Sequence, residues 1–577
     1  MAHDPSEPIA SRSGLFFSEP HVAGFTHRAF TKAMGFDEED MQRPVIGICN
    51  TYSELNNCNS HLRELAEAVK RGVWQAGGFP MEFPTISLGE IYLSPTSMLY
   101  RNLAAMDTEE MIRGNPIDGV VLLTNCDKTT PAALMGACSA DLPAILLSGG
   151  PALNGNYKGQ MLGACTDCRR MTAEWQAGAI DDETYKEIEG SVFRSRGHCM
   201  VMGTASTMNS LAEALGIALP GNGATPATDA ARIRLAEQAG RRIVTLAQEG
   251  VRPSQIITQQ AIENAITLVC ALGGSTNAVV HLPAIAGRLG IEIPLSLWDT
   301  ISRRTPLIAN MRPSGQYQME DLHFAGGIPA VLRELLPLLH GDALTVTGRT
   351  LAENVATTPI HNRDVIRPLA EPLQPEGGLS IITGNLAPDG AVIKHAAATP
   401  ALLQHRGRAI VFKDVEDVRA RINDPDLDVT PDDVLVLQNS GPVGGPGMPE
   451  VGILPIPQKL LKQGVRDMLR ISDARMSGTA YGAIVLHVAP ESAIGGPLAL
   501  VQDGDEIELD FANRRLHLYV DDAELARRRA AWQPPQPAFG RGYGRLYLQH
   551  VTQAPQGADF DFLLGNDPVK PMEQPKF

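Results

Sequence analysis

Residues 118–126 read DGVVLLTNC, and valine or leucine fills four consecutive positions of this run. An unbroken apolar run is typical of a strand in a parallel sheet, because helices cover both faces of such a sheet. The run ends at Cys126, and Asp127 and Lys128 follow it directly. Ligands bind outside the carboxyl ends of the strands in open α/β sheets, so we expect a functional site here.

The segments around this strand alternate between strand and helix patterns. HLRELAEAVKRGVWQ (61–75) has apolar residues on one helical face, and Thr129 or Thr130 could cap a helix through PAALMGACSA (131–140). Three further runs are predicted strands: PVIGICN (44–50), MEFPTISL (81–88) and PAILLSG (143–149). This β-α-β-α order predicts an α/β fold, a mostly parallel sheet with helices on both sides.

The second half of the chain changes character twice. Residues from about 204 to 345 are mainly helical in pattern, and RPLAEPLQPEGG (367–378) is a Pro- and Gly-rich segment that could be a linker. Short β-rich runs follow, and DEIELDF and RRLHLYV, separated by Ala512 and Asn513, predict a hairpin. Such runs indicate a barrel or a sandwich. We expect the last twenty or so residues to form a tail, which could dock on a neighbour.

The composition is that of a globular enzyme with several domains. The 577 residues are too many for one core, and 44% are hydrophobic while 20% are charged. The net charge of −16 and the lack of a basic block argue against nucleic acid or an anionic membrane as a partner. No secretory signal and no apolar run of about 18 residues is visible, so we expect no membrane span. Eight cysteines are too sparse for a disulfide scaffold, so we expect a cytoplasmic enzyme with reduced thiols.

Three of the predicted strands are followed by residues that can do chemistry. Cys58 follows the strand at 44–50, Glu90 follows the strand at 81–88, and Cys126 with Asp127 and Lys128 ends the central strand. Cys58 also precedes a predicted helix, whose dipole would favour its thiolate. The alternative is that the two cysteines are small buried hydrophobic residues. Asp and Lys side chains are rarely buried without a partner, which favours the functional interpretation for the central strand.

The other cysteines are less informative. Cys199 precedes a predicted helix that begins near Thr204. Cys165 and Cys168 form a CxxC pair that could be half of a zinc site or a redox pair. No second CxxC completes a zinc site, so an incidental loop pair is favoured. Three cysteines lie in apolar runs and are expected in the core: Cys49, Cys138 and Cys270.

Three loops combine glycine with polar residues. GGSTNAVVHL (273–282) could hold an anion at a helix start or could simply be a tight turn, and it is neither a P-loop nor a Rossmann fingerprint. NSGPVGGPGMPEVG (439–452) is a long loop that contains Glu450. ISDARMSGTAYG (471–482) places Ser477 beside a glycine, but no histidine is close in sequence. A Ser-His-Asp hydrolase is therefore not supported.

Several of these segments together resemble the dihydroxy-acid dehydratase and 6-phosphogluconate dehydratase family, from about residue 43 to 560. The matching stretches are NNCNSHLRELAE (56–67), CDKTTPA (126–132), the Cys199 segment with MGTASTM (202–208), GGSTNAVVHL, GPGMPE (445–450) and ISDARMSGTAYG. Members of this family remove water from a 2,3-dihydroxy acid and give a 2-keto-3-deoxy acid. The resemblance implies an α/β domain over residues 1–372 and a β-barrel-like domain over residues 373–577.

The resemblance also implies two sets of ligands at one site. Three cysteines would hold an iron–sulfur cluster: Cys58, Cys126 and Cys199. The cluster would be [2Fe–2S], with [4Fe–4S] as the alternative, and three protein ligands would leave one iron open. Four residues would bind Mg²⁺: Glu90, Asp127, Lys128 as a carbamate, and Glu450. Ser477 would be the catalytic base, and Thr479 would help to hold the substrate carboxylate.

General chemistry agrees with these implied roles. The proton next to a carboxylate is very weakly acidic, so a cation has to stabilise the enediolate that forms when it leaves. Hydroxide is a poor leaving group, and the open iron would serve as its Lewis acid. A carbamate turns lysine into an anionic oxygen ligand that suits Mg²⁺. A serine alkoxide is a plausible base only beside such positive charge.

The motif details favour a sugar acid as substrate. CDKTTPA and SDARMSGTAYG look more like the sugar-acid dehydratases than the branched-chain enzyme, for which CDKNMPG and DGRFSG versions are expected. We therefore expect a non-phosphorylated pentonate or hexonate, such as L-arabinonate, D-xylonate or D-gluconate. No strong basic pocket for a phosphate is evident, which disfavours 6-phosphogluconate.

Three alternatives stay open at this point. The first is a dihydroxy-acid dehydratase of branched-chain amino-acid biosynthesis. The second is a thiolate metal-binding or redox protein built around CxxC and Cys126, and the third is a scaffold without activity. The family resemblance further implies a homodimer or homotetramer.

Overall fold

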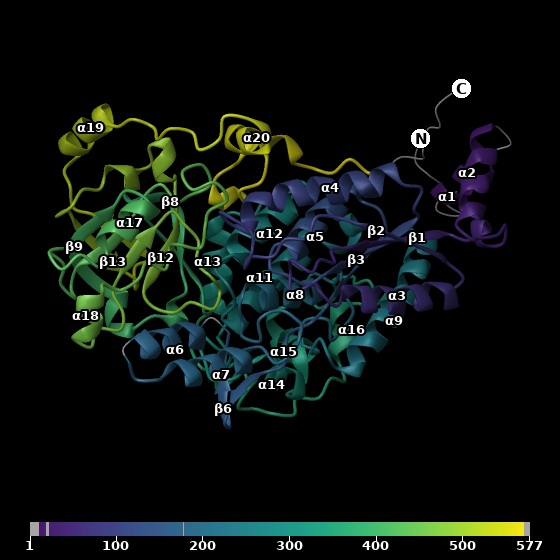
Figure 1. Ribbon diagram of the computed structural model, residues 1–577, viewed down its shortest axis with the longest axis horizontal. Helices are drawn as coiled ribbons and strands as arrows, with labels where there is room; N and C mark the ends of the chain where they lie inside the picture. Colours follow the sequence, from purple (N-terminus) through teal and green to yellow (C-terminus); the bar gives the residue numbers. More distant parts are fainter. Residues whose placement is uncertain (1–10, 19–21, 165, 177, 570–577) are drawn as a thin grey trace.

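The computed structural model describes residues 11–18, 22–164, 166–176 and 178–569 of the 577-residue chain. These residues form a helix-rich α/β body and a β-barrel that pack against each other (Figure 1). The predicted α/β class, with a parallel sheet and a second, barrel-like part, is confirmed. The boundary between residues 372 and 373 stays a prediction.

The α/β body is built on four parallel strands in the order β2-β1-β3-β4. Their bounds are Val45–Asn50 (β1), Phe79–Pro84 (β2), Gly119–Thr124 (β3) and Ala144–Ser148 (β4). Every residue of β1, β3 and β4 is buried, as their apolar runs predict. The edge strand β2 ends at Pro84, so residues 85–88 lie outside the strand that we predict there. Proline lacks a backbone N–H and suits such an edge position.

Two pairs of helices cover the two faces of the sheet (Figure 1). Their bounds are Leu62–Gln75 (α3) with Ala230–Glu249 (α9), and Arg101–Gly114 (α4) with Thr129–Ala140 (α5). Glycine allows the helices of each pair to approach closely. A Cβ at Gly72 of α3 would lie 2.0 Å from the carbonyl oxygen of Glu237 in α9. A Cβ at Gly136 of α5 would lie 2.6 Å from the carbonyl oxygen of Ala105 in α4.

The helix α5 starts differently from the prediction. Its first residue is Thr129 and its N-cap is Lys128, so the prediction that Thr129 or Thr130 caps the helix is wrong. The hydroxyl of Thr130 instead donates to Oδ1 of Asn209 at 2.8 Å, which joins α5 to a neighbouring helix. The N-cap residue Lys128 makes no side-chain cap hydrogen bond, and its ammonium group contacts Asp127 in the site described below.

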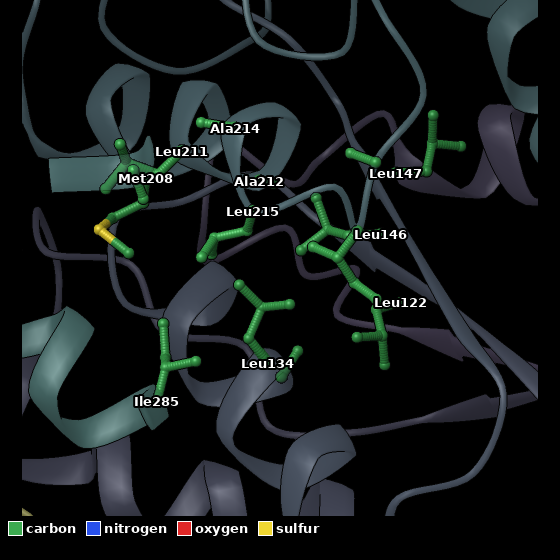
Figure 2. Packing of buried hydrophobic residues seen from close by; sticks show 14 of the residues in the cluster. Leu122, Leu134, Leu146, Leu147, Met208, Leu211, Ala212, Ala214, Leu215 and Ile285 are labelled. Atoms are coloured by element: carbon green, nitrogen blue, oxygen red, sulfur yellow. The ribbon is translucent and has the colours of Figure 1, made fainter. Parts of the chain in front are cut away.

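A second helical layer packs against α5. It consists of α8 (Thr204–Ala214), α11 (Gln259–Leu272) and α12 (Ala278–Gly287). Figure 2 shows Met208 and Leu211 of α8 near Leu134 of α5 and Ile285 of α12. These side chains are fully or almost fully buried. This layer fixes the amino end of α8 relative to the strands, because close-packed interiors leave little freedom to shift.

The remaining helices of the α/β body are shorter or lie at its periphery. They are α1 (Arg12–Ser18), α2 (Val22–Ala33), α6 (Thr166–Gln176), α7 (Asp182–Val192), α10 (Pro253–Ile256), α13 (Leu295–Arg304), α14 (Met319–Phe324), α15 (Gly327–Leu335) and α16 (Leu351–Val355). A small hairpin of β5 (Gly155–Tyr157) and β6 (Gln160–Leu162) lies beside α7.

The second body is a closed barrel with the strand order β10-β11-β12-β8-β7-β14-β13-β9. Its strands are β7 (Ser380–Gly384), β8 (Ala387–Ile393), β9 (Gln404–Phe412), β10 (Val434–Leu437), β11 (Arg470–Ser472), β12 (Ile484–Ala489), β13 (Glu506–Asp510) and β14 (Arg515–Leu518). The predicted hairpin is confirmed, since β13 and β14 pair antiparallel. Closure leaves no unpaired strand edge. The α-helices that the structure describes in this half of the chain are α17 (Val415–Arg421), α18 (Gln458–Lys462), α19 (Asp522–Ala531) and α20 (Gly542–His550). Of these, α20 packs against the α/β body, where Tyr543 donates to the carbonyl oxygen of Leu99.

The predicted linker is packed against the α/β body. Gln374 forms an isolated antiparallel β-bridge with Leu307. The backbone N–H of Gly378 donates to the carbonyl oxygen of Cys270 at 2.9 Å. A Cβ at Gly378 would lie 2.6 Å from Cα of Gly273, so only glycine allows this approach. The segment is therefore a packed strap between the two bodies.

The end of the chain returns to the α/β body. Asp559 forms a buried ion pair with Arg288 at 2.6 Å, and Phe560 is fully buried. The backbone N–H of Val569 donates to the carbonyl oxygen of Ala140 at 2.9 Å. The expected tail thus docks on its own chain as far as residue 569. Within the described residues, no helix combines the length and the apolar character needed to cross a membrane.

Replacement of Asp559 by alanine should destabilise the protein. Arg288 would stay buried and, among the residues that the structure describes, would keep only Glu109 as a carboxylate partner, at 3.3 Å. Removal of one partner of a buried ion pair costs about 3 kcal/mol or more. Urea unfolding should show this loss, while Asp561→Ala, at an exposed carboxylate, should change stability by less than about 0.5 kcal/mol. Equal stability of the two variants would contradict the role of this ion pair.

Candidate active site

The three predicted groups meet at the carboxyl edge of the parallel sheet. Cys58 lies in the loop after β1, and Glu90 lies in the loop after β2. Cys126 to Lys128 lie between β3 and α5. The ammonium group of Lys128 is 3.1 Å from Oε2 of Glu90, so the predicted convergence of these loops is confirmed.

Lys128 is fully buried and contacts three carboxylates. Its Nζ lies 2.6 Å from Oδ2 of Asp127, 3.1 Å from Oε2 of Glu90 and 3.5 Å from Oε1 of Glu450. Glu450 comes from the loop after β10, so this group joins the two bodies. Burial alone would lower the pKa of Lys128, but Asp127 and Glu90 more than compensate and raise it. We call these four residues the Lys128 cluster.

The Lys128 cluster contains all four residues predicted to bind Mg²⁺. Among residues 11–18, 22–164, 166–176 and 178–569, no three His, Cys, Asp or Glu side chains converge as a metal site. The ammonium group lies between the three carboxylates instead, and it neutralises part of their charge. The metal-binding role of these residues therefore stays a prediction.

Arg475 is a second cation of the site, and the sequence analysis missed it. It is fully buried, its Nη1 is 3.1 Å from Oε1 of Glu450, and its Nη2 is 3.4 Å from Oγ1 of Thr96. Thr96 and Ser97 both donate to the carboxylate of Glu90. Burial would raise the pKa of Glu90, but Lys128, Arg475 and these hydroxyls together lower it to about 2. The available signal was the arginine of ISDARMSG, two residues before Ser477.

The three cysteines predicted to bind an iron–sulfur cluster lie near one another. The pKa of Cys58 is raised by its hydrogen bond with Cys126, then by burial, and also by the charges of Cys199 and Asp127. The expected stabilisation of its thiolate by the dipole of α3 is thus outweighed in this state. Cys126 is buried, whereas Cys58 and Cys199 are half-buried.

Two asparagines hold the cysteine loops against each other. Asn59 accepts a hydrogen bond from the backbone N–H of Cys126 at 3.0 Å, and Asn125 donates to the carbonyl oxygen of Cys58 at 2.7 Å. Each asparagine is adjacent to one cysteine and fixes the backbone of the other. Both are fully buried. This reciprocal pair explains the asparagine after Cys58 and the asparagine before Cys126, for which the sequence alone suggests no role.

The remaining cysteine predictions have different outcomes. Cys199 lies five residues before Thr204, where α8 begins as predicted. Cys165 lies outside the described residues, and Cys168 is in α6, so the role of the CxxC pair stays open. The three cysteines assigned to the core are fully buried: Cys49, Cys138 and Cys270.

Ser477 and Thr479 lie in the loop between β11 and β12, where the barrel meets the α/β body. Their hydroxyl oxygens are 2.9 Å apart. A Cβ at Gly478, between them, would lie 2.7 Å from Cβ of Ser275 and 2.8 Å from the backbone nitrogen of Thr204. The loop is therefore pressed against the amino end of α8 and the Gly-rich loop 273–282. The site is assembled between two bodies, a common position for ligand pockets.

The Gly-rich loop 273–282 is a helix-to-helix turn that contributes to the site. Gly273 ends α11 in the left-handed conformation with φ 57°, and Asn277 is the N-cap of α12. The side-chain amide of Asn277 donates to Oε1 of Glu450 at 3.2 Å. Asn277 is thus another site residue that the sequence analysis did not name. The motif GGSTN marks this turn in the sequence, but only the structure shows that Asn277 contacts Glu450.

Comparisons with known proteins agree along nearly the whole chain. The family model "Dihydroxy-acid/6-phosphogluconate dehydratase N-terminal" matches residues 43–354, and the corresponding C-terminal model matches residues 364–558. These two matches together cover both bodies of the structure.

Individual relatives match over similar lengths. An L-arabonate dehydratase of Azospirillum brasilense is 54% identical over 566 residues, which cover 96% of this chain and 97% of that protein. An L-arabinonate dehydratase of Rhizobium leguminosarum bv. trifolii is 53% identical, with coverages of 93% and 94%. A 6-deoxy-6-sulfo-D-gluconate dehydratase of Pseudomonas putida is 50% identical, with coverages of 97% and 97%. Dihydroxy-acid dehydratases match at 42% to 44% identity.

Replacement of Asn59 by alanine should loosen the cysteine loops. The buried N–H of Cys126 would lose its acceptor, which costs about 1–3 kcal/mol of unfolding free energy. Iodoacetamide should also modify Cys126 faster in this variant, as followed by mass spectrometry of the labelled peptide. Asn57→Ala, at an exposed position in the same loop, is the matched control. Identical stability and labelling in the two variants would refute this role of Asn59.

Proposed function

The chain belongs to the dihydroxy-acid/6-phosphogluconate dehydratase family, and we propose that it dehydrates a non-phosphorylated sugar acid to the 2-keto-3-deoxy acid. The observation that carries this proposal is the buried Lys128 cluster beside the loops of three cysteines, at the edge where both bodies meet. Family membership implies an iron–sulfur cluster and Mg²⁺ in general terms.

The charges of the Lys128 cluster fit a magnesium site. Three carboxylates and the two cations Lys128 and Arg475 leave one net negative charge. A lysine carbamate together with Mg²⁺ carries the same charge as the lysine ammonium alone, so the exchange leaves this balance unchanged. Carboxylate and carbamate oxygens are also the ligands that Mg²⁺ prefers. We therefore propose Glu90, Asp127, Glu450 and carbamylated Lys128 as its ligands.

The cysteine loops fit an iron–sulfur cluster. Cys126 and Cys199 both lie close enough to Cys58 to raise the pKa of its thiol, and Asn59 and Asn125 fix the backbones of Cys126 and Cys58. Cysteine thiolates are the usual ligands of such clusters. We propose a [2Fe–2S] cluster here. When bound, the two groups would supply positive charge for the substrate carboxylate and a Lewis acid for the C3 hydroxyl.

The residues of the barrel loop would act on the substrate itself. We propose that Ser477 accepts the proton from C2 and that Thr479, 2.9 Å from it, helps to bind the substrate carboxylate. A serine becomes a base only where its negative charge is stabilised. The buried cations Lys128 and Arg475 lie in the same interface and support this assignment.

The comparisons favour an arabinonate-type substrate. Relatives that act on L-arabinonate and on a sulfonated gluconate are 50% to 54% identical to the chain, whereas dihydroxy-acid dehydratases are 42% to 44% identical. We also propose a homodimer or homotetramer. The helix α2 and its end expose four large apolar side chains: Val22, Phe25, Phe30 and Met34. Apolar surface of this kind commonly marks an interface.

The substrate proposal is tested by keto-acid formation with anaerobically prepared protein and Mg²⁺. The panel is L-arabinonate, D-xylonate, D-gluconate, D-galactonate and 2,3-dihydroxyisovalerate. We expect turnover of aldonates above the branched acid, and iron with acid-labile sulfide in the same preparation. Preference for the branched acid would move the enzyme to amino-acid biosynthesis. Zinc without acid-labile sulfide would contradict the proposed iron–sulfur cluster.

Replacement of Lys128 by alanine should abolish turnover. The change removes the group proposed to form the carbamate and leaves three carboxylates close together. We expect kcat/KM to fall by about 100-fold to 1,000-fold or more, together with a loss of bound Mg²⁺ by elemental analysis. Lys462→Ala, at an exposed lysine of α18, should keep both activity and metal. Wild-type activity in Lys128→Ala would reject the magnesium proposal.

A further inference from the structure

A second buried lysine, Lys394, lies beneath the loop that carries Ser477. It follows the last residue of β8 in the barrel, and its side chain is fully buried. Its Nζ is 3.3 Å from the carbonyl oxygen of Gly478. That carbonyl belongs to the residue between Ser477 and Thr479, so the amine touches the backbone of the proposed catalytic loop.

Lys394 has no anionic partner within the part of the chain that the structure describes. Its hydrogen bond to Gly478 is the single side-chain bond found there, and no charged group acts on its pKa. Burial alone lowers its pKa to about 7. Lysine is almost never fully buried unless it is paired. A lysine kept at such a position therefore needs a reason other than stability.

The surroundings of the loop suggest this reason. From the side of the α/β body, Ser275 and the backbone nitrogen of Thr204 close on Gly478. From the barrel side, Lys394 binds the carbonyl of the same residue, and the backbone N–H of Gly482 donates to the carbonyl oxygen of Ala397 at 2.8 Å. The loop is thus held from both sides at Gly478, and the amine is its polar contact on the barrel side.

We propose that Lys394 is a positioning residue for Ser477, which holds the Gly478 carbonyl and so fixes the hydroxyls of Ser477 and Thr479. This inference rests on the proposed role of Ser477 as the base. A misplacement of about 1 Å in a catalytic group can slow turnover by about 100-fold. Lys394 acts on Ser477 through the backbone of the loop, so its role is to position the serine.

The test is Lys394→Met in the cluster- and Mg²⁺-loaded enzyme, assayed with the best aldonate of the panel. Methionine keeps the apolar volume and removes the amine. We expect kcat to fall by about 10-fold to 100-fold while KM stays within about threefold. The kinetic isotope effect on kcat with C2-deuterated substrate should be at least as large as in the wild type. Lys413→Met, at an exposed lysine that follows β9, should leave kcat and the isotope effect unchanged.

Stability separates a positioning role from a purely structural one. Burial lowers the pKa of Lys394, so the unfolded chain binds more protons there and the residue destabilises the fold most at low pH. The melting temperature of Lys394→Met at pH 6 should therefore equal or exceed that of the wild type. This advantage should shrink as the pH rises from about 7 toward 10.5.

Several outcomes would overturn the proposal. An unchanged kcat, a change in KM alone, or a slower enzyme with a smaller isotope effect would each reject the positioning role. Parallel loss of melting temperature and activity would show that Lys394 is structural. These results leave the proposed function intact if the wild type dehydrates aldonates and Ser477→Ala does not. A wild type that turns over no acid of the panel, or an active Ser477→Ala, would overturn the proposed function and this inference together.

Discussion

The contact of one buried lysine with three carboxylates determines the architecture of the site. Lys128 is placed by the end of a central strand, and Glu450 reaches it from the barrel. A buried carboxylate without a partner is costly, so the barrel loop gains from docking on this lysine. The two bodies are therefore joined at the place where the chemistry is proposed. The packed strap lies on the α/β body before the chain enters the barrel, and the ion pair of Arg288 with Asp559 fixes the segment after the barrel on the α/β body.

Two lysines at this interface are equally buried and differ in their electrostatics. Three carboxylates raise the pKa of Lys128, whereas Lys394 has only a carbonyl partner and burial lowers its pKa to about 7. The difference follows from neighbouring charge, since burial acts on both in the same direction. One lysine is suited to the centre of an ionic group, and the other is suited to hold a loop without adding strong charge.

The family motifs contain small polar residues and glycines in addition to the proposed metal ligands and the proposed base, and the structure shows what these residues do. Asn59 and Asn125 tie the cysteine loops together, and Asn277 reaches Glu450 across the interface. Gly478 lets the loop of Ser477 approach α8 at a distance that no other residue allows. These contacts create rigid positions for groups that must stay close together, which is the usual requirement of an enzyme site.

The sequence by itself determined the parallel sheet, the strand ends and the chemical groups at them. Apolar runs such as that of β3 report burial on both faces, and the site then follows from the common direction of parallel strands. It did not reveal Arg475 or Lys394 as site residues, nor the packing of the strap. A side chain's partners come from distant segments that only the folded chain brings within a few ångströms. Which charge meets which, and at what depth, was decided by the tertiary structure alone.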